Sequence, residues 1–431
     1  MLSIKQKEIR NHFQLLASAF LLLTSAAHAA EWSFEPSVSG LISYDDNYRL
    51  TNTPTSSTEW SLKPSSDFSR RTETSTLTGS VDLDFRRFDD ANLNTNDSRL
   101  TVNYDQQFSP LSRFGLNAQW NRDTTLDSEL ATTGLVLNRV RRSQKQLAPS
   151  YSHAFTERLS GTASLSAQQV RYARTTTGFN DYDYTTASGQ LNWQYSPRTT
   201  FTGAVDLSRY ETPDTLFQVD NRQLTVGLKS ELTELMSLNT SAGMRSTDTR
   251  IKTGALDCPP GTVVDFISLF TGQLPCVDPV TGLRTSPIQV FNTTKTTNTG
   301  SVLSAELQRG TETNKLTATI SRSVTPSATG LVNSSQIRLR LDHEFSEKLS
   351  GAFDLSWYRS TSKNSATTLN TPDSTFIRIQ PSLNWQIDRQ WRFTTNYRYS
   401  QVKRTGTLGT ATSNALSLVL DYRWPKMAVS R

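Results

Sequence analysis

The stretch SQIRLRLDHEFSEKLSGAFDLSWYRS, residues 335–360, decides the fold that we expect of this chain. Apolar or aromatic side chains alternate with polar or charged ones as far as Phe345, and the alternation resumes at Leu349 after a short polar segment. Strict alternation is typical of a β-strand, because successive side chains leave a pleated backbone in opposite directions. The stretch therefore predicts a β-hairpin with one apolar face and one polar, largely charged face.

The same unit recurs in residues 100–120, 149–167, 191–207, 226–244 and 381–399. Each copy has an alternating run that ends on an aromatic or apolar residue, a short turn, and a second alternating run. Hairpins repeated in this way indicate an up-and-down meander of strands.

The composition favours a membrane-spanning barrel over a soluble sandwich. Hydrophobic residues make up only 35% of the chain, which is too little to fill the cores of a soluble β-protein of this length. A barrel with a wet lumen needs apolar side chains only toward lipid, and its strands must close because unpaired backbone groups are costly there. We therefore expect an all-β, transmembrane, up-and-down antiparallel β-barrel of about 18 strands, within a range of about 16 to 20.

The connections also follow a pattern. Short turns alternate with longer connections, as in bacterial barrels that place short turns in the periplasm and long loops outside. An even number of strands would then leave both termini in the periplasm. Four prolines, Pro36, Pro64, Pro149 and Pro381, are expected near strand starts or on weakly patterned stretches, where a missing N–H donor is tolerated.

Residues 1–29 are typical of a secretory signal peptide. A basic leader precedes an apolar stretch of about a dozen residues, shorter than the roughly 20 that a spanning helix needs, and Ala27-His28-Ala29 fits a cleavage site. The mature chain, residues 30–431, is then a single outer-membrane β-barrel domain. Its last alternating run, LSLVLDYRW in residues 416–424, resembles the terminal strand that the barrel assembly machinery recognises, although the chain continues to Arg431.

The longest expected loop, residues 252–296, contains the two cysteines of the chain, Cys258 and Cys276. In an exported protein an isolated pair is most simply a disulfide, and closing a loop of this size contributes about 3 kcal/mol in the chain-entropy model. Such a loop either folds into or over the pore mouth or forms a protease-resistant surface loop. A metal site is not expected, because the two sulfurs lack nearby histidines.

Enzymatic activity is not expected. The mature chain has two histidines, His153 and His343, and both lie two residues before the aromatic residue that closes a strand. That position belongs to the aromatic girdle at the periplasmic rim, so Ser-His-Asp chemistry lacks a well-placed base. We also expect no cofactor, and no nucleic-acid partner, since no basic aromatic surface motif accompanies the net charge of +6.

The polar parity of the strands predicts the lumen side chains. The pore-lining candidates are Arg338, Arg340, Arg378, Arg392, Arg398, Arg423, Asp82, Asp84, Arg86, Asp342 and Glu344. These residues form either a mutually neutralising lattice that holds the barrel open or a mildly cationic conduit that favours anionic solutes.

Residues near the start of the mature chain resemble the opening of a known family of barrels. Residues 32–50, WSFEPSVSGLISYDDNYRL, carry Tyr44, Asp45, Asp46 and Asn47, and Pro64 follows in WSLKP. These motifs resemble the opening of the β-barrel porin 2 type of outer-membrane porin, which is associated with exopolysaccharide and protein-sorting gene clusters. The resemblance implies a barrel in the outer membrane of a Gram-negative bacterium. The Asp-Asp-Asn motif itself is expected to form a turn, to cap the rim or to bind a cation.

The sequence thus predicts an outer-membrane pore or export conduit, with exopolysaccharide as a candidate cargo. Its expected partners are outer-membrane lipid, the barrel assembly machinery and polysaccharide-export components. The alternative is a structural or assembly barrel whose lumen is closed and transports nothing, and an outer-membrane enzyme ranks third.

Overall fold

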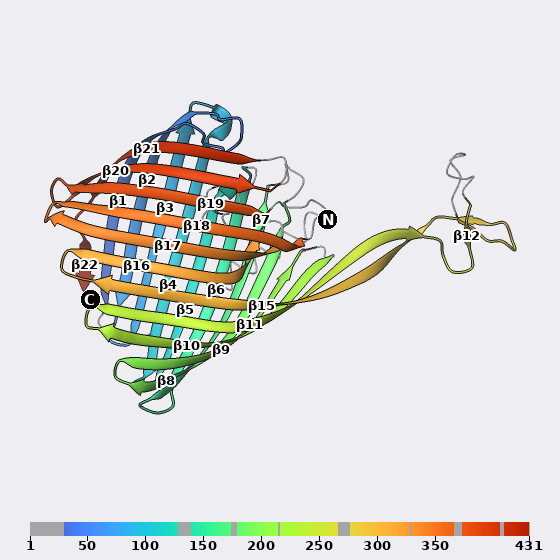
Figure 1. Ribbon diagram of the computed structural model, residues 1–431, viewed down its shortest axis with the longest axis horizontal. Helices are drawn as coiled ribbons and strands as arrows, with labels where there is room; N and C mark the ends of the chain where they lie inside the picture. Colours follow the sequence, from blue (N-terminus) through green and yellow to red (C-terminus); the bar gives the residue numbers. More distant parts are fainter. Residues whose placement is uncertain are drawn as a thin grey trace.

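The described residues of the chain form a closed antiparallel β-barrel of 18 strands (Figure 1). The computed structural model describes residues 30–126, 128, 139–173, 179–213, 216–265, 276–327, 330–365, 373–405 and 409–430. The expected signal peptide, residues 1–29, lies outside them. Each barrel strand pairs with the next one along the chain, and the last pairs with the first.

The first eleven barrel strands are β1 (Glu31–Asp45), β2 (Ser57–Arg71), β3 (Ser75–Phe88), β4 (Thr95–Ser109), β5 (Ser112–Thr124), β6 (Arg141–Ala154), β7 (Leu159–Tyr172), β8 (Tyr182–Ser196), β9 (Thr199–Glu211), β10 (Phe217–Thr233) and β11 (Met236–Asp257). The other seven are β15 (Ile288–Gly310), β16 (Asn314–Ser327), β17 (Gly330–Ser346), β18 (Leu349–Ser365), β19 (Ser374–Gln386), β20 (Trp391–Arg404) and β21 (Thr410–Arg423). A 3-10 turn, η1 (Ala91–Leu93), precedes β4. Among the described residues, no helix has the length and apolar character needed to cross a membrane.

The barrel closes where β21 runs beside β1, from Ser37 opposite Arg423 to Asp45 opposite Ala415. Beyond Pro425 the chain continues along the same edge as β22 (Met427–Ser430), which pairs with the start of β1. The extension past the terminal aromatic residue is therefore a continuation of the closing strand rather than a free tail.

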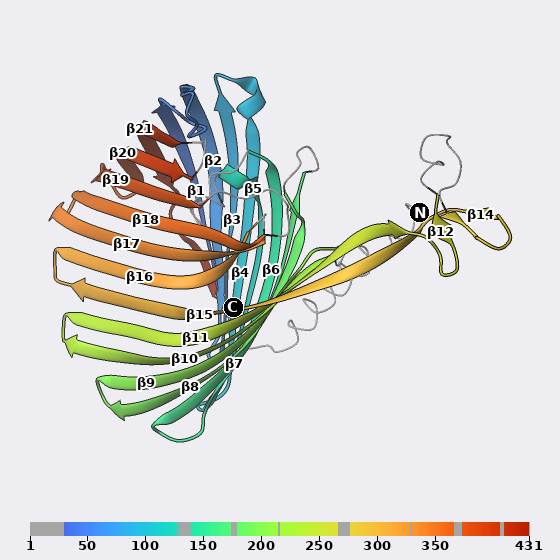
Figure 2. The same ribbon diagram turned by 45° about the vertical axis from the view of Figure 1, so that its right-hand side comes forward.

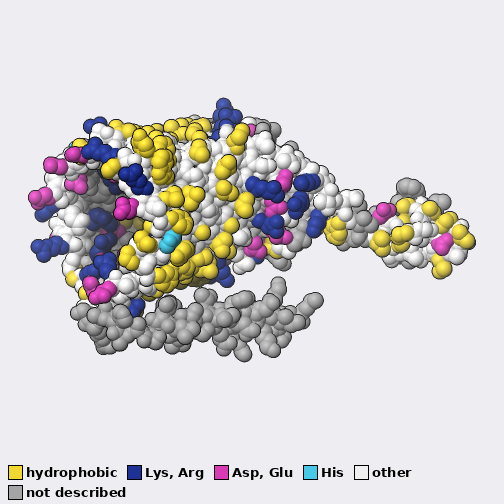
Figure 3. Space-filling view, turned by 90° about the horizontal axis from the view of Figure 1, so that it is seen from below, with side chains coloured by type: hydrophobic (Ala, Val, Ile, Leu, Met, Phe, Trp, Pro, Cys, Tyr) yellow, Lys and Arg dark blue, Asp and Glu magenta, His cyan; other side chains and the backbone are white. Residues whose placement is uncertain are grey.

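Alternation divides the side chains of every strand between two faces. On β3, Val81, Leu83 and Phe85 are each 39% exposed, whereas Asp82 and Asp84 line an internal cavity. Figure 3 shows hydrophobic side chains gathered over the middle of the wall and charged ones toward its two ends. The apolar face of the sequence pattern is therefore the outer face of the barrel, and the polar face is the inner one.

The expected alternation of short and long connections is present. Counted in order around the barrel, every second strand is followed by a short turn at one end of the barrel, such as residues 110–111 between β4 and β5. Most connections at the other end are longer. Both ends of the described chain lie at the short-turn end, because Glu31 is paired with Ser430 and with Arg71, which directly precedes the short turn between β2 and β3. One connection differs: β16 ends at Ser327 and β17 begins at Gly330, whose φ of +116° suits the glycine of a tight reversal.

Four prolines were expected near strand starts or on weakly patterned stretches, and the structure places Pro36 within β1 and the other three deeper inside their strands. Pro64, Pro149 and Pro381 lie in the interiors of β2, β6 and β19 rather than near strand starts. Each interrupts the ladder on one side only, and the ladder resumes in the same register, as between Leu62 opposite Phe85 and Ser65 opposite Asp82. A strand tolerates the missing donor because its other neighbour remains paired along the segment.

The expected long loop of residues 252–296 is largely ordered as an arm. β11 and β15 pair without interruption from Met236 to Asp257, far beyond the wall, and the arm stands away from the barrel (Figures 1 and 2). Its tip is a small sheet of β12 (Val263–Val264), β13 (Cys276–Val277) and β14 (Arg284–Thr285). The described residues of the arm do not enter the pore mouth, which favours the surface-loop alternative over a segment that folds into or over the mouth.

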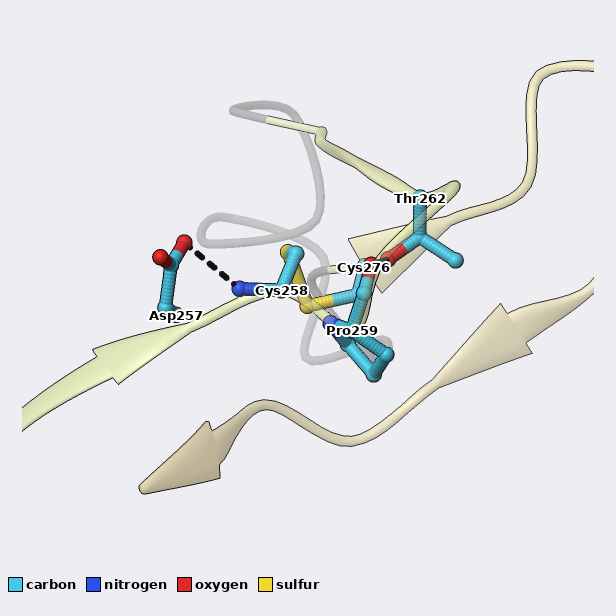
Figure 4. Close-up of a disulfide and its surroundings, with 5 residues drawn as sticks. All are labelled: Asp257, Cys258, Pro259, Thr262 and Cys276. Carbon is cyan, nitrogen blue, oxygen red and sulfur yellow. Dashed lines mark hydrogen bonds between the residues drawn. A yellow bond between two sulfur atoms is a disulfide. The ribbon is translucent and has the colours of Figure 1, made fainter. Parts of the chain in front are cut away.

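The expected disulfide between Cys258 and Cys276 is present and joins the end of β11 to the tip sheet (Figure 4). Asp257 accepts a hydrogen bond from the backbone N–H of Cys258 at 2.8 Å, and Cys276 is fully buried. Nearby, the backbone N–H groups of Val280 and Thr281 donate to Asp278 and hold the pKa of its carboxyl group below the usual range. The disulfide therefore stabilises the tip rather than the barrel.

Replacing both cysteines by serine is expected to loosen the tip and leave the barrel unchanged. The lost loop constraint is worth about 3 kcal/mol in the chain-entropy model. It acts on the segment that the disulfide encloses and, through Cys276, on β14, which pairs with β13. Trypsin should then cleave after Arg284 faster in the double variant than in the parent chain, while urea unfolding of the barrel is unchanged. Equal cleavage rates, followed by mass spectrometry of the fragments, would show that the tip sheet holds without the disulfide.

Candidate functional site

A large internal cavity, which we call the main cavity, lies along one wall of the lumen. It has a volume of about 850 Å³ and is lined by residues of β1–β6 and β19–β21 and by the loops at their long-loop ends. The lining is mainly hydroxyl, amide and charged side chains, because these are the inward positions of alternating strands. Seven Asp or Glu and seven Lys or Arg are among the lining residues, so this cavity does not support the expected cationic lumen.

Two further cavities continue the first one toward the short-turn end. A cavity of about 260 Å³ shares Ser39, Lys63, Asp82 and Asp421 with it, and extends to Arg389 and other residues of the β19–β20 turn. A third, of about 390 Å³, shares Asp67 with the second. We call these three adjoining cavities the polar track. Figure 3 shows the barrel hollowed at this end, with charged side chains of both signs around the opening.

Ion pairs hold much of the polar track in place. Arg86 on β3 donates to both carboxylate oxygens of Glu59 at 2.6 and 3.1 Å and lies 3.8 Å from Asp97. Farther along the sheet, Arg142 on β6 pairs with Asp123 on β5 at 3.0 Å. Nearer the short-turn end, Arg392 pairs with Asp421 at 3.2 Å. Such bidentate or networked pairs fix long side chains against the wall, which keeps the space between them free.

Several charged residues of the track remain available to a solute, and three of them lie close together in the sheet. Within the described part of the chain, Lys63, Arg99 and Asp82 make no side-chain hydrogen bond or ion pair, and all three line the main cavity. They lie on β2, β4 and β3, three adjacent strands. A solute that passes here meets two cationic groups and one anionic group that are not already satisfied by the protein.

The Asp-Asp-Asn motif forms a cluster at the long-loop rim that fastens the first strand to the last. Asp45 accepts hydrogen bonds from Arg398 at 2.9 Å and from Ser413 at 2.7 Å. Asp46 accepts from the backbone and the side-chain amide of Asn414, at 2.7 and 2.8 Å. Asn47, only 1% exposed, donates to the carbonyls of Thr51 and Thr412, both at 2.8 Å.

This rim cluster leaves no carboxylate oxygen of Asp45 or Asp46 without a donor from the protein. The cation site considered from the sequence is therefore not supported, and the motif combines the expected turn with a cap on the rim. Tyr44 points outward and is 54% exposed, and Pro64 lies in the interior of β2, outside the rim cluster.

Two apolar clusters lie at the long-loop end of the barrel. The larger contains buried side chains of β7–β10, including Tyr182 and Tyr210, which stack at 4.8 Å, together with Leu331 at the start of β17. Tyr210 also donates a hydrogen bond to the carbonyl of Ser327 at 3.2 Å. The smaller cluster contains Leu50, Tyr358, Phe376, Val402 and Ala411. The larger cluster narrows the mouth, because Tyr210 of β9 contacts Ser327 of β16 although these strands are not neighbours in the sheet.

The structure separates the pore-lining candidates into two groups. Arg378, Arg398, Asp82, Asp84 and Arg86 line the main cavity, and Arg392 and Arg423 line the second. The four candidates of the deciding hairpin lie on β17, away from the polar track. These are Arg338, Arg340, Asp342 and Glu344. The guanidinium group of Arg338 lies 5.3 Å from the centroid of the Tyr358 ring. Arg340 pairs with Asp342 and Asp354, and Glu344 is exposed.

Several residues of the track are not among the pore-lining candidates predicted from the sequence, and these include Glu59, Lys63, Asp97 and Arg99. They lie on β2 and β4, where serines and a proline blur the apolar alternation. The parity of Trp60 and Leu62 on β2 was the signal that would have assigned Glu59 and Lys63 to the inner face.

Both histidines lie at the short-turn end beside the aromatic residues that follow them. His153 contacts the ring of Phe155 at 5.1 Å between centroids, and His343 contacts Phe345 at 4.5 Å. The described residues contain no group of three or more His, Cys, Asp or Glu that is arranged to hold a metal ion.

No family model matches the chain. No curated protein matches it either. Among solved structures, the chain is similar to Pseudomonas aeruginosa OpdK with vanillate, at 12% identity and a TM-score of 0.46 over 92% of this chain and 99% of that one. It is also similar to Pseudomonas aeruginosa OccK2 (OpdF) in complex with glucuronate, at 11% identity and a TM-score of 0.44 over 91% and 98% of the chains. The chain is also similar to Acinetobacter baumannii OccAB3, at 10% identity and a TM-score of 0.43 over 92% of this chain and 99% of that one. Likeness at this level carries no inference about what this chain binds.

Proposed function

We propose that the barrel spans the outer membrane of a Gram-negative bacterium and conducts small hydrophilic solutes along the polar track. The observation that carries this proposal is the succession of three polar cavities that share lining residues from the long-loop end to the short-turn end. The belt of exposed apolar side chains around the middle of the wall fits lipid, and an alternating wall that is apolar outside and polar inside is the pattern of transmembrane barrels.

The orientation and the partners follow from the same proposal. With short turns in the periplasm, both ends of the mature chain would lie there and the arm would project from the cell surface. The barrel assembly machinery would recognise the alternating outer face of β21. The apolar belt would contact outer-membrane lipid. The resemblance of residues 32–50 and Pro64 to β-barrel porins supports the porin class, and exopolysaccharide cargo with polysaccharide-export partners rests on that resemblance alone.

A closed structural barrel is the second candidate, and the apolar clusters at the mouth favour it. Tyr182, Tyr210 and Leu331 are almost fully buried at the long-loop end, where an open pore would be wet. The two candidates differ in one measurable property, which is the steady conductance of the folded barrel.

The test is single-channel conductance in a planar bilayer, with the parent chain and the variant K63E/R99E. The parent should show a steady conductance, and reversing the charge of Lys63 and Arg99 should shift the reversal potential in a salt gradient toward cation preference. The matched control K229E/K348E changes two lysines outside the three cavities. Adding anionic and neutral oligosaccharides to either side then shows whether an anion preference or a polysaccharide cargo exists. A correctly folded barrel without conductance would overturn the conduit in favour of the closed barrel.

A further inference from the structure

A charged patch faces outward at the root of the arm, immediately beyond the apolar belt. We define the root patch as Arg209 on β9, Asp220 and Arg222 on β10, Asp248 and Arg250 on β11, and Lys295 on β15. Figure 3 shows Lys, Arg, Asp and Glu side chains gathered at this place, between the hydrophobic belt and the arm.

The register shows that these side chains share the outer face with the belt. Asp220 is directly opposite both Arg209 and Asp248, and Lys295 is opposite Arg250. Arg222 lies two residues from Leu224, whose side chain is 61% exposed on the outer wall. Side chains two residues apart in a strand share a face and are separated by about 7 Å. The patch therefore begins where the belt ends.

Four cations and two carboxylates make up the root patch, and their arrangement leaves positive charge unsatisfied. Arg209 and Arg250 both pair with Asp220, at 2.7 and 3.5 Å, while Thr297 donates to Asp248 at 2.6 Å. Asp248 is within electrostatic reach of Arg222, Arg250 and Lys295. Within the described part of the chain, however, Arg222 and Lys295 make no hydrogen bond or ion pair, and both are exposed.

The position of the root patch relative to the bilayer indicates which anion it binds. The polar headgroup zone extends about 5–8 Å beyond the hydrocarbon on each side of a bilayer, so outward cations about 7 Å past the belt lie at headgroup depth. Phosphate groups of lipid headgroups carry the complementary charge, and arginine binds them with two parallel hydrogen bonds. Soluble anions are not confined to the depth of the headgroups. Lipid phosphates are, because the acyl chains of the same lipid contact the apolar belt directly beneath the cations.

We propose that the root patch binds the phosphate groups of an outer-leaflet lipid headgroup and so anchors the β9–β11 and β15 side of the barrel, with the arm above it, to the membrane surface. The acidic residues orient the arginines, because Asp220 fixes Arg209 and Arg250, and Arg222 and Lys295 supply the free charge. This inference rests on the proposed placement of the barrel in the outer membrane with the arm outside.

The test uses the full mature chain folded in a non-ionic detergent and titrated with lipid A, with lipid A stripped of its phosphates, and with inorganic phosphate. Native mass spectrometry measures the bound lipid. Each surface cation contributes about 1 kcal/mol to attraction by an anionic lipid surface, so R222Q/K295Q should bind lipid A roughly ten- to thirty-fold more weakly than the parent.

The matched control is R359Q/K403Q. Arg359 and Lys403 are exposed on β18 and β20, on the other side of the long-loop end, and are separated by Thr375 of β19. The control should bind lipid A like the parent, and phosphate-free lipid A should bind the parent no better than lipid A binds R222Q/K295Q. Equal binding of R222Q/K295Q and the parent, equal loss in the control, or full competition by inorganic phosphate would overturn the lipid site.

The same samples separate this inference from the proposed conduit. R222Q/K295Q lies on the outer face, so its single-channel conductance should equal that of the parent. A parent chain that binds phosphorylated lipid but does not conduct would reject the conduit alone, and one that conducts but shows no phosphate-dependent binding would reject the lipid site alone.

Discussion

Replacing Asn47 by alanine is expected to lower the free energy of unfolding of the barrel by about 2–4 kcal/mol. The side chain is 1% exposed, donates to the carbonyls of Thr51 and Thr412, and accepts from the backbone N–H of Thr51 at 3.2 Å. Alanine leaves three part-buried backbone groups without this partner, and an unsatisfied group costs about 1–3 kcal/mol when water cannot replace the partner. Urea unfolding in lipid vesicles, followed by tryptophan fluorescence and by gel mobility, measures the change.

The control for this prediction is Asn239→Ala on β11. Asn239 is exposed and makes no side-chain hydrogen bond within the described part of the chain, so its replacement should change stability by less than about 0.5 kcal/mol. If the two variants unfolded at the same urea concentration, the rim cluster would contribute nothing beyond an ordinary loop.

The effect should be large because of where the cluster lies. Thr412 belongs to β21 and Asn47 follows β1, so the hydrogen bond between them crosses the junction at which the barrel closes. Asp45 adds a second crossing through Ser413 and a third contact to Arg398 of β20. Other strand pairs are joined by a local turn, whereas this pair must bring together the two ends of the chain, and loop-closure entropy grows with chain length. A short motif at the first loop thereby stabilises the longest-range pairing in the fold.

The sequence predicted the barrel and its strand number because alternation survives wherever one face meets lipid. Residues 335–360 show this most clearly, and β17 and β18 pair across most of that stretch as expected, from Ile337 opposite Trp357 to Leu341 opposite Phe353. Residues 252–296 lack such alternation because an arm that leaves the wall has no lipid-facing side. Their polar, threonine-rich composition is typical of a loop, although both strands continue through it.

The sequence could not locate the functional surface within the lumen. Parity assigns Arg340 and Arg86 alike to the polar face, yet Arg86 lines the main cavity and Arg340 pairs with Asp342 and Asp354 elsewhere. Contacts between strands that are not neighbours determine which part of the lumen is left open as a cavity. The contact between Tyr210 and Ser327 is of this kind, since their separation in sequence is 117 residues. No local pattern encodes such a contact.

Replacing Tyr210 by alanine is expected to destabilise the mouth and to raise the conductance of the barrel. The ring is fully buried, stacks on Tyr182 at 4.8 Å and meets Phe217 edge-on at 5.8 Å, so truncation should cost about 3–5 kcal/mol. It also removes the hydroxyl group that joins β9 to the carbonyl of Ser327 on β16. With both contacts gone, the long-loop end should open wider, and planar-bilayer conductance measures the difference.

Two variants keep this prediction testable if Tyr210→Ala folds poorly. Tyr210→Phe removes only the hydrogen bond to Ser327, so it should lower stability by about 1 kcal/mol and keep the parent conductance. Leu331→Ala removes the partner side chain from β17 and should raise conductance while leaving the aromatic stack intact. A folded Tyr210→Ala or Leu331→Ala barrel with unchanged conductance would show that the apolar cluster does not limit the pore. The narrowest point would then lie within the polar track, where Lys63 and Arg99 face the solute.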